Sequence, residues 1–163
     1  MTIQPLEKRH YPKVQEIYLH GIASGNATFE TEAPSWEAWD KNHLTSCRLA
    51  AVDEQQQVLG WAALTAVSGR CVYAGVAELS VYVHRDFQGR GIGKKLLQEL
   101  VLESEKQNLW TLKAGIFPEN LASIKIHEQC GFRQVGYQEK IGKMKNVWRD
   151  TVLMERRSKV VGI

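Results

Sequence analysis

Hydrophobic positions repeat along most of the chain with the period of either a helix or a strand. In residues 11–23, apolar side chains recur at helical spacing behind Pro12, which suits a first helical turn. Ser35 suits the N-cap of a second helix, which carries two tryptophans and Leu44. The chain is therefore expected to open with two short helices.

Strand and helix patterns alternate through the rest of the sequence. The runs CRLAAV and QVLGWAALTAV flank the polar segment DEQQQ and predict a hairpin. The stretch ELSVYV alternates strictly, with Leu79, Val81 and Val83 on one side. The elements expected after it are a helix over 91–106, a strand in WTLKAGIF, a helix closed by Gly131, and strands in RQVGYQEK and NVWRDTVLME. This order predicts one layered α/β (α+β) domain over residues 1–163, with a frayed tail from about residue 157.

Composition and charge narrow the class of protein. The chain has 163 residues, 44% of them apolar and 24% charged, which is typical of one globular domain. A net charge of +3 suits a small polyanionic ligand, but no basic and aromatic interleaving indicates a nucleic-acid surface. The three cysteines, Cys47, Cys71 and Cys130, are expected to be reduced thiols of a cytoplasmic protein. They lack the spacing of a metal site and the histidines are scattered, so no metal is expected. The sequence shows no signal peptide and no membrane-spanning run.

The helix expected at 91–106 carries its charges in the unfavourable direction. Arg90, Lys94 and Lys95 crowd its start, although the positive end of the helix dipole disfavours cations by roughly 0.3–1 kcal/mol each. Gly89, Gly91 and Gly93 alternate just before and within that start, where backbone N–H groups can face an anion; the alternative is a plain tight turn. A bound diphosphate would make the same charges favourable.

The spacing of these glycines excludes two common phosphate motifs. A P-loop requires GxxxxGK[ST], but Gln88 stands five positions before Gly93 and Lys95 follows Lys94, so the hydroxyl that binds Mg²⁺ is missing. A dinucleotide fingerprint requires GxGxxG, whereas the turn is GxGxG and follows an expected antiparallel hairpin. Nucleotide hydrolysis and NAD binding are therefore not expected.

The segment QGRGIG instead resembles the Q/RxxGxG/A signature of the GNAT superfamily of acetyl-CoA-dependent N-acetyltransferases. A second family segment, NLASIKIHEQCGF, follows in the expected order. Together with NATFETEAPSWEAW, AELSVYVHRDFQGRGIG and NVWRD, these segments resemble phosphinothricin and methionine sulfoximine/sulfone acetyltransferases over about residues 3–155. Two departures stand out: the loop AVSGRCVYAG lacks a tryptophan that relatives often carry, and Arg149 stands where WHD or WLD is usual.

The resemblance implies a fold and a cofactor site. It implies a mixed sheet of about six to seven strands flanked by about four helices, with acetyl-CoA between the splayed strands at 79–83 and 111–117. It assigns cofactor contacts to Val81, Tyr82, Val83, Gln88, Gly89, Arg90, Gly91, Ile92, Gly93, Lys94, Asn120 and Ser123. From its position alone, Asn120 also suits a helix N-cap.

Catalytic and acceptor-binding residues follow from the same resemblance. Glu78 is the candidate base for the acceptor amine, the alternative being an exposed strand glutamate. His127 stands where many relatives place a tyrosine that protonates the thiolate; the alternative is a satisfied, half-buried histidine. The residues expected to line the acceptor site are Phe29, Arg70, Cys71, Val72 and Tyr73. Cys130 is expected to be a small buried side chain rather than a nucleophile.

The function that this resemblance implies is acetyl transfer from acetyl-CoA to the α-amine of a small amino-acid-like substrate. Alternatives are another amine, such as a polyamine, an aminoglycoside or a protein N-terminus, and a CoA-binding sensor without activity. The family analogy also implies a homodimer. The charge distribution and the lack of a long apolar run indicate that neither nucleic acid nor a membrane is among its partners.

Overall fold

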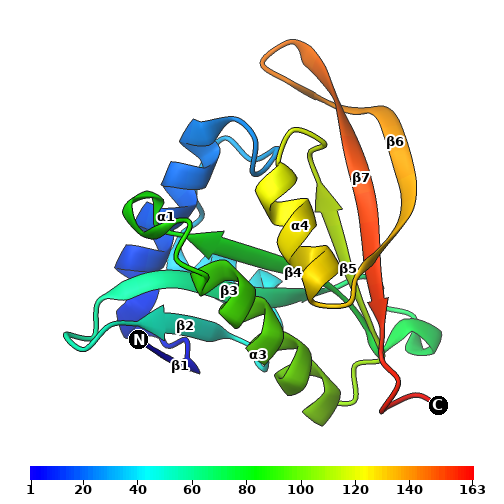
Figure 1. Cartoon of the computed structure of the whole chain (residues 1–163), viewed down its shortest axis with the longest axis horizontal. Coiled ribbons are helices and arrows are strands. Elements are labelled where there is room, and N and C mark those ends of the chain that lie inside the picture. The colour runs from blue at the N-terminus through cyan, green and yellow to red at the C-terminus, as the bar shows by residue number, and fades with distance from the viewer.

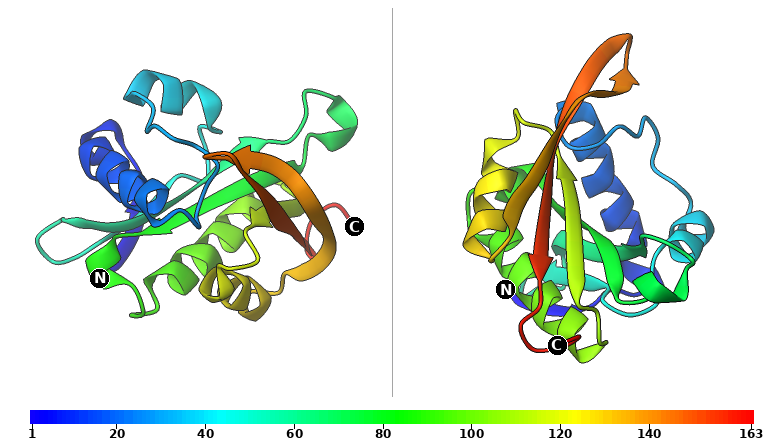
Figure 2. Two further views of the ribbon diagram at one scale, coloured as in Figure 1. Left: turned by 90° about the horizontal axis from the view of Figure 1, so that it is seen from above. Right: turned by 90° about the vertical axis from the view of Figure 1, so that its right-hand side faces the viewer.

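A computed structural model describes all residues, 1–163, as one seven-stranded sheet with helices on both faces (Figures 1 and 2). The strands are β1 (Thr2–Pro5), β2 (Leu49–Val52), β3 (Val58–Ala66), β4 (Val76–Val83), β5 (Thr111–Ile116), β6 (Arg133–Met144) and β7 (Val147–Arg157). The helices are α1 (Tyr11–Ser24), α2 (Trp36–Asn42), α3 (Ile92–Lys106) and α4 (Leu121–Gln129), with short 3-10 turns η1 (Lys8–His10), η2 (Cys71–Tyr73) and η3 (Arg85–Phe87). This is the mixed sheet with four helices that the sequence predicts.

The strands lie in the order β1-β2-β3-β4-β5-β7-β6. Every neighbouring pair is antiparallel except β4 and β5, which run parallel. That parallel ladder has only three pairs, from Val76↔Thr111 to Glu78↔Lys113. Beyond it, the remaining residues of β4 pair with β3 alone, and those of β5 pair with β7 alone. The sheet therefore splits along its middle.

Two hydrophobic clusters hold the helices on opposite faces of the sheet. Leu49 and Ala51 of β2 face the larger cluster, which includes the apolar stripe of α3, whereas Ala50 and Val52 face the cluster under α1 and α2. Successive strand residues point to opposite faces, so one short strand serves both clusters. The view from above in Figure 2 shows the two helical layers with the sheet between them.

The predicted helix boundaries have clear local causes. The Ser35 hydroxyl accepts a hydrogen bond from Ala38 N at 3.2 Å, which confirms it as the N-cap of α2. The α4 helix has Cys130 as its C-cap and is followed by Gly131 at φ +87°, the left-handed conformation expected of a closing glycine. No helix of the chain is long and apolar enough to cross a bilayer.

Two terminal segments differ from the prediction. Residues 2–5 form β1, which the sequence analysis missed because four residues ending in proline carry little strand pattern. After β7, the expected frayed tail is instead tied down: Ser158 is buried, its hydroxyl donates to Glu105 Oε1 at 2.8 Å, and its N–H donates to Trp110 O at 2.8 Å. The chain therefore stays on the protein surface beyond Arg157.

Candidate functional site

The split between β4 and β5 leaves part of β4 without a partner on one edge. Val76 O accepts a hydrogen bond from Val67 N, and His84 N donates to Leu59 O. The even-numbered residues of β4 are therefore the ones whose backbone groups form hydrogen bonds with β3. Because hydrogen-bonded pairs alternate in an antiparallel ladder, the peptide groups of Val81 and Val83 point the other way, toward β5. The ladder to β5 has ended by then. These peptide groups lie where an extended ligand could pair with them, as the sequence analysis expects.

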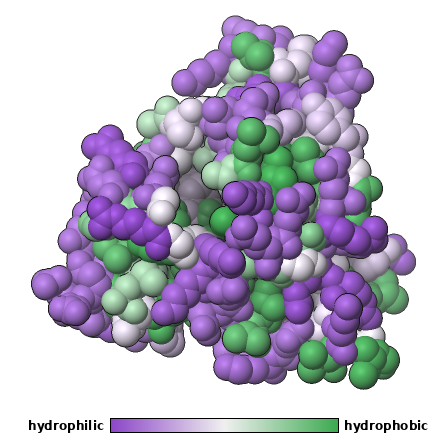
Figure 3. Space-filling model, viewed as in Figure 1, coloured by the Kyte–Doolittle hydropathy of each residue, from purple (hydrophilic) through white to green (hydrophobic).

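The molecular surface is hollowed in the same region. Figure 3 shows a recess that Figure 1 places between the C-terminal end of β4 and α4. Val81 and Val83 pack against the larger core cluster, together with Ile124 of α4. Their backbone therefore faces the gap, while their side chains anchor the strand beside it.

The glycine-rich turn stands at the open end of this gap, directly after η3. Gly89 and Gly91 have φ of +75° and +78°, and a Cβ atom added to either would meet nothing within 4 Å. Gly91 is the N-cap of α3, with no side-chain cap and no acidic residue in the first helical turn. Lys95 N bonds to Gly91 O at 3.0 Å as the helix begins, so the N–H groups before it have no intrahelical acceptor. This turn has the open backbone and the positive helix end that a diphosphate requires.

The third glycine of the turn has a different role. A Cβ atom on Gly93 would lie 3.3 Å from Ile126 and 3.4 Å from Val83, tighter than ordinary packing. Gly93 therefore allows α3 to approach α4 and β4 closely. Arg90, in contrast, lies over the Phe87 ring at 5.1 Å, which holds its cation beside the turn.

Glu78 occupies the point where β4 and β5 separate. It pairs with Lys113 in the last step of the parallel ladder, on the face opposite Leu79. Its side chain is exposed and forms no hydrogen bond or ion pair. The carboxylate is therefore free to accept a proton at the closed end of the gap.

His127 is more deeply buried than the sequence analysis expects. Only 1% of it is exposed, its ring packs against Phe132, and Nδ1 lies 2.7 Å from Ser123 O. A carbonyl can only accept, so Nδ1 carries the ring proton and Nε2, which is buried without a partner, holds a lone pair. Burial lowers the pKa of His127, although its bond to Ser123 opposes the shift. In this tautomer Nε2 can accept a proton but has none to donate, so the proton-donor role that the resemblance implies for His127 stays a prediction.

Asn120 caps α4 as its position suggests. Its Oδ1 accepts from Ser123 N at 3.2 Å, and its Nδ2 donates to Asn26 O at 3.2 Å. Both ends of the side-chain amide are therefore engaged within the chain. Asn120 ties the start of α4 to the loop between α1 and α2.

The same loop is held by Arg149 of β7, a residue to which the sequence analysis gave no role. The guanidinium donates to Gly25 O at 2.7 Å and Asn26 Oδ1 at 2.8 Å, and it lies 3.3 Å from Glu119 Oε2. It also stacks over the Phe117 ring at 4.1 Å. The unusual residue in NVWRD was the only sequence signal, and it did not show that the partners lie up to 124 positions away.

Phe29 and the segment 70–73 do not come together in one chain. Phe29 packs edge-to-face on Phe117, just beyond the C-terminal end of β5. Arg70, Val72 and Tyr73 are exposed and precede the N-terminal end of β4, with Arg70 over the Tyr73 ring at 5.6 Å. Because β4 and β5 run parallel, these groups lie at opposite ends of the pair, which differs from the shared acceptor site expected from the sequence.

The chain resembles known acetyltransferases along most of its length. The model of the acetyltransferase (GNAT) family matches residues 11–132. A phosphinothricin N-acetyltransferase of Alcaligenes faecalis is 30% identical over 95% of this chain and 81% of its own length. An L-methionine sulfoximine/L-methionine sulfone acetyltransferase of Salmonella typhimurium is 28% identical over 95% of this chain and 93% of its own.

A solved structure agrees with the sequence relatives. The crystal structure of a GNAT superfamily phosphinothricin acetyltransferase from Sinorhizobium meliloti, in complex with acetyl-CoA, superposes with a TM-score of 0.89. It is 29% identical and covers 99% of this chain and 90% of that one. The split sheet and the glycine turn therefore belong to an architecture that is known to hold acetyl-CoA in another protein.

Proposed function

The chain belongs to the acetyltransferase (GNAT) family, and on that premise we propose that it acetylates the α-amine of a small amino-acid-like acceptor of the phosphinothricin or methionine sulfoximine/sulfone type. The acetyl donor is acetyl-CoA. The single observation that carries the proposal is the three-pair ladder of β4 and β5, which opens toward the glycine turn at the start of α3.

The residues of the gap suit acetyl-CoA. The peptide groups of Val81 and Val83 have the spacing of an extended strand and can pair with the amide groups of the pantetheine arm. Gly89 and Gly91 leave open backbone for the diphosphate, and Arg90 and Lys94 add positive charge there. Bound acetyl-CoA supplies an acetyl group activated as a thioester.

Glu78 supplies the proton acceptor in this mechanism. An amino-acid α-amine is mostly protonated at neutral pH and must lose a proton before it can attack the thioester carbonyl. The Glu78 carboxylate takes that proton, directly or through water, and its place where the two strands part suits this role. As the new C–N bond forms and the C–S bond breaks, the CoA thiolate leaves and is protonated from solvent. His127 has no step in this scheme.

The activity is tested with a panel of amines and a thiol-reactive dye that follows the release of CoA. The panel holds phosphinothricin, methionine sulfoximine, methionine sulfone, spermidine, an aminoglycoside and a peptide with a free N-terminus. Turnover with one or more of the first three compounds, and little with the others, is expected. Turnover confined to the other amines would overturn the acceptor, whereas CoA binding without any turnover would indicate a sensor.

The homodimer implied by the family stays a prediction, and one surface feature supports it. The hairpin of β6 and β7 extends from the body of the molecule (Figure 1). It exposes more than half of the side chains Tyr137, Ile141, Val147 and Trp148. Apolar side chains gathered on one projection are typical of a protein interface. Light scattering on the purified chain and on Trp148→Ser measures the oligomeric state directly. A parent dimer that becomes monomeric in the variant would support the β6–β7 hairpin as the dimer interface.

A further inference from the structure

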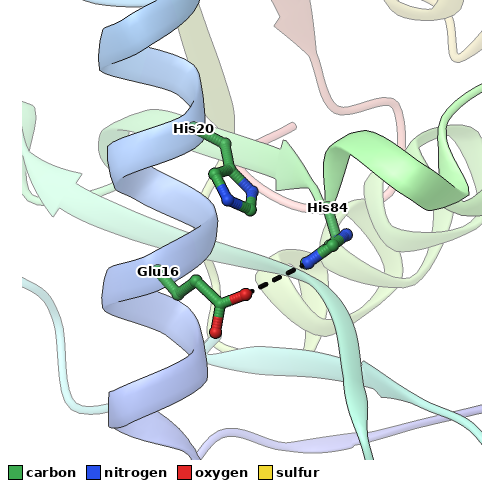
Figure 4. A group of neighbouring side chains, drawn as sticks. All are labelled: Glu16, His20 and His84. Atoms are coloured by element: carbon green, nitrogen blue, oxygen red, sulfur yellow. Dashed lines mark hydrogen bonds and ion pairs between the residues drawn. The ribbon is translucent and has the colours of Figure 1, made fainter.

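Three potential metal ligands from distant parts of the chain meet beside the glycine turn. Glu16 and His20 are four positions apart on α1, so they share one face of the helix, and His84 follows the end of β4. Figure 4 shows the three side chains pointing into one space between α1 and the β4–η3 junction. One ligand atom from each lies within 4.8 Å of the other two. This arrangement was not expected from the sequence, where the histidines are widely spaced.

We propose that Glu16, His20 and His84 form a binding site for a divalent transition-metal ion of the zinc class. Two ligands at about 2.0–2.1 Å from a tetrahedral Zn²⁺ ion lie about 3.3 Å apart. Glu16 Oε1 and His84 Nε2 are 3.2 Å apart, so this pair already has the required separation. His84 is buried, with 8% of its side chain exposed, whereas 42% of the Glu16 side chain is exposed and gives the ion access from solvent.

His20 is the ligand that must move. Its Nδ1 is buried and forms no hydrogen bond, which leaves a polar atom unsatisfied in the metal-free protein. The His20 and His84 rings meet edge-to-face, with centroids 4.8 Å apart. The ligand atoms lie within 4.8 Å of one another, and ligands of a tetrahedral ion lie about 3.3 Å apart, so His20 has to move by up to about 1.5 Å. Coordination through Nδ1 would satisfy the atom that has no other partner.

The cluster also has an ordinary explanation, a hydrogen bond between His84 and Glu16. Asp86 N donates to His84 Nδ1 at 3.2 Å, so in the metal-free state Nε2 carries the proton and donates to Glu16 Oε1. Metal binding at Nε2 requires that proton to move to Nδ1, which breaks the hydrogen bond from Asp86 N. The nearest carboxylate oxygen, Asp86 Oδ2, lies 3.8 Å away and must approach to accept the proton. A carboxylate behind a ligating histidine is the usual second partner of such a ligand. The ion pair between Lys13 Nζ and the other carboxylate oxygen, Glu16 Oε2, at 2.5 Å, is not affected by metal binding at Oε1.

The donor set identifies the class of ion. Two imidazoles and one carboxylate suit Zn²⁺, Co²⁺ or Ni²⁺, whereas Mg²⁺ and Ca²⁺ require mainly oxygen ligands. Three protein ligands leave a fourth position for water. The position of the cluster suggests a bracing role: His84 packs on Phe87 at 5.4 Å, and Phe87 lies under Arg90 at 5.1 Å, so the ion would join α1 to the segment that leads into the glycine turn.

The test uses the full chain carrying Cys71→Ser, which removes an exposed thiol that would compete for metal. Co²⁺ is titrated and followed by calorimetry and by its visible absorption, which strengthens in a four-coordinate site. One ion per chain with imidazole ligands is expected. His20→Gln and His84→Gln should each weaken Co²⁺ binding by at least about tenfold. Loss of a residue that only supports a metal ligand already lowers metal affinity by about that factor, and loss of a ligand itself should cost no less.

The matched control is His43→Gln, because His43 stacks on Trp39 in α2 and lies outside the cluster. It should bind Co²⁺ as the parent does. If His84→Gln fails to fold, as judged by circular dichroism, Glu16→Gln serves in its place, since this side chain is partly exposed. The proposal is overturned if the parent shows no saturable binding, or if binding is equal in the parent and in the folded cluster variants.

Discussion

Glu78 of β4 lies beside Lys113 of β5 in the last pair that joins these two strands. Glu155 of β7 pairs with Lys113 from the other side, so the three side chains form one row across a single face of the sheet. Only Glu78 stands at the edge of the gap. The row therefore contains the proposed base and, for comparison, a second glutamate on the same face that is paired with Arg133 and lies away from the gap.

Replacement of the proposed base should affect turnover and leave cofactor binding intact. Glu78→Gln keeps the shape of the side chain but removes proton acceptance, so kcat should fall by about 10²–10⁴-fold at neutral pH. The Kd of acetyl-CoA, measured by calorimetry, should not change. Glu155→Gln is the matched control and should retain most of the parent kcat. Equal losses in the two variants, or no loss in Glu78→Gln, would remove Glu78 from the mechanism.

The glycine turn can be tested against a second glycine with the same backbone conformation. Gly91→Ala places a Cβ atom in the left-handed region, at φ +78°, and should lower the free energy of unfolding by roughly 1–2 kcal/mol. Gly25→Ala, at φ +73° after α1, should cost a similar amount. Only Gly91→Ala should also weaken CoA binding, because its methyl group stands where the diphosphate is proposed. Calorimetry with CoA separates the two effects, and an equal CoA affinity in both variants would contradict the diphosphate site.

Arg149 should determine how well the acceptor is held. Arg149→Lys loses the planar contact with Phe117 and the forked bonds to Gly25 and Asn26, which should cost about 1–3 kcal/mol of unfolding free energy. Since these bonds fix the loop that carries Phe29, the KM of the acceptor should rise more than the KM of acetyl-CoA. Arg133→Lys, an exposed arginine paired with Glu155, is the control and should change stability by no more than about 1 kcal/mol. A parallel rise in both KM values would argue against a specific role for this loop.

Buried histidines should make the protein sensitive to acid. Burial lowers the pKa of His127 below its usual 6.5, so the unfolded chain takes up a proton at a higher pH than the folded chain does. The stability that this residue contributes is therefore complete above pH 6.5 and is lost as the pH falls through the folded-state pKa.

Urea unfolding between about pH 7 and pH 5 measures this dependence. The unfolding free energy should fall with pH in the parent and fall less steeply in His127→Gln. Some slope should remain, because burial also lowers the pKa of His10 and His43. Identical slopes in the parent and in the variant would show that His127 does not titrate with unfolding.

Local features of the fold could be predicted from the sequence, and contacts between distant segments could not. The alternation in ELSVYV, the Ser35 cap and the glycine turn each depend on residues that are neighbours in the chain, and the corresponding elements form as expected. Residues 2–5 become a strand only because β2 offers them an edge. Arg149 contacts Gly25, 124 positions away in the sequence, and His84 contacts Glu16, 68 positions away. No local sequence pattern predicts either contact.

The burial of His127 shows a similar limit. Its flanking isoleucines indicate a helix with one apolar face, but the depth of the ring depends on residues outside the helix, such as Phe132, which contacts it edge-to-face. The motif match implies a catalytic role for His127, and its hydrogen bond to Ser123 O adds that the ring proton sits on Nδ1. Residue identity at a family position is thus insufficient without the environment of the side chain.

The short ladder between β4 and β5 also marks a place where the chain can be divided. Residues 1–107 contain β1 to β4 with α1 to α3, and residues 109–163 contain β5 to β7 with α4, so each fragment keeps its own antiparallel strands. The two fragments are joined by the three residue pairs of the β4–β5 ladder and by side chains packed around α3. Side-chain bonds also cross the division, from Arg149 and Asn120 to the loop after α1 and from Ser158 to Glu105. A break at the turn around Asn108, where φ is already +60°, should yield two fragments that reassemble when mixed. Because acetyl-CoA would contact both halves, its presence should favour that reassembly, which makes this fold a candidate for a split reporter of cofactor level.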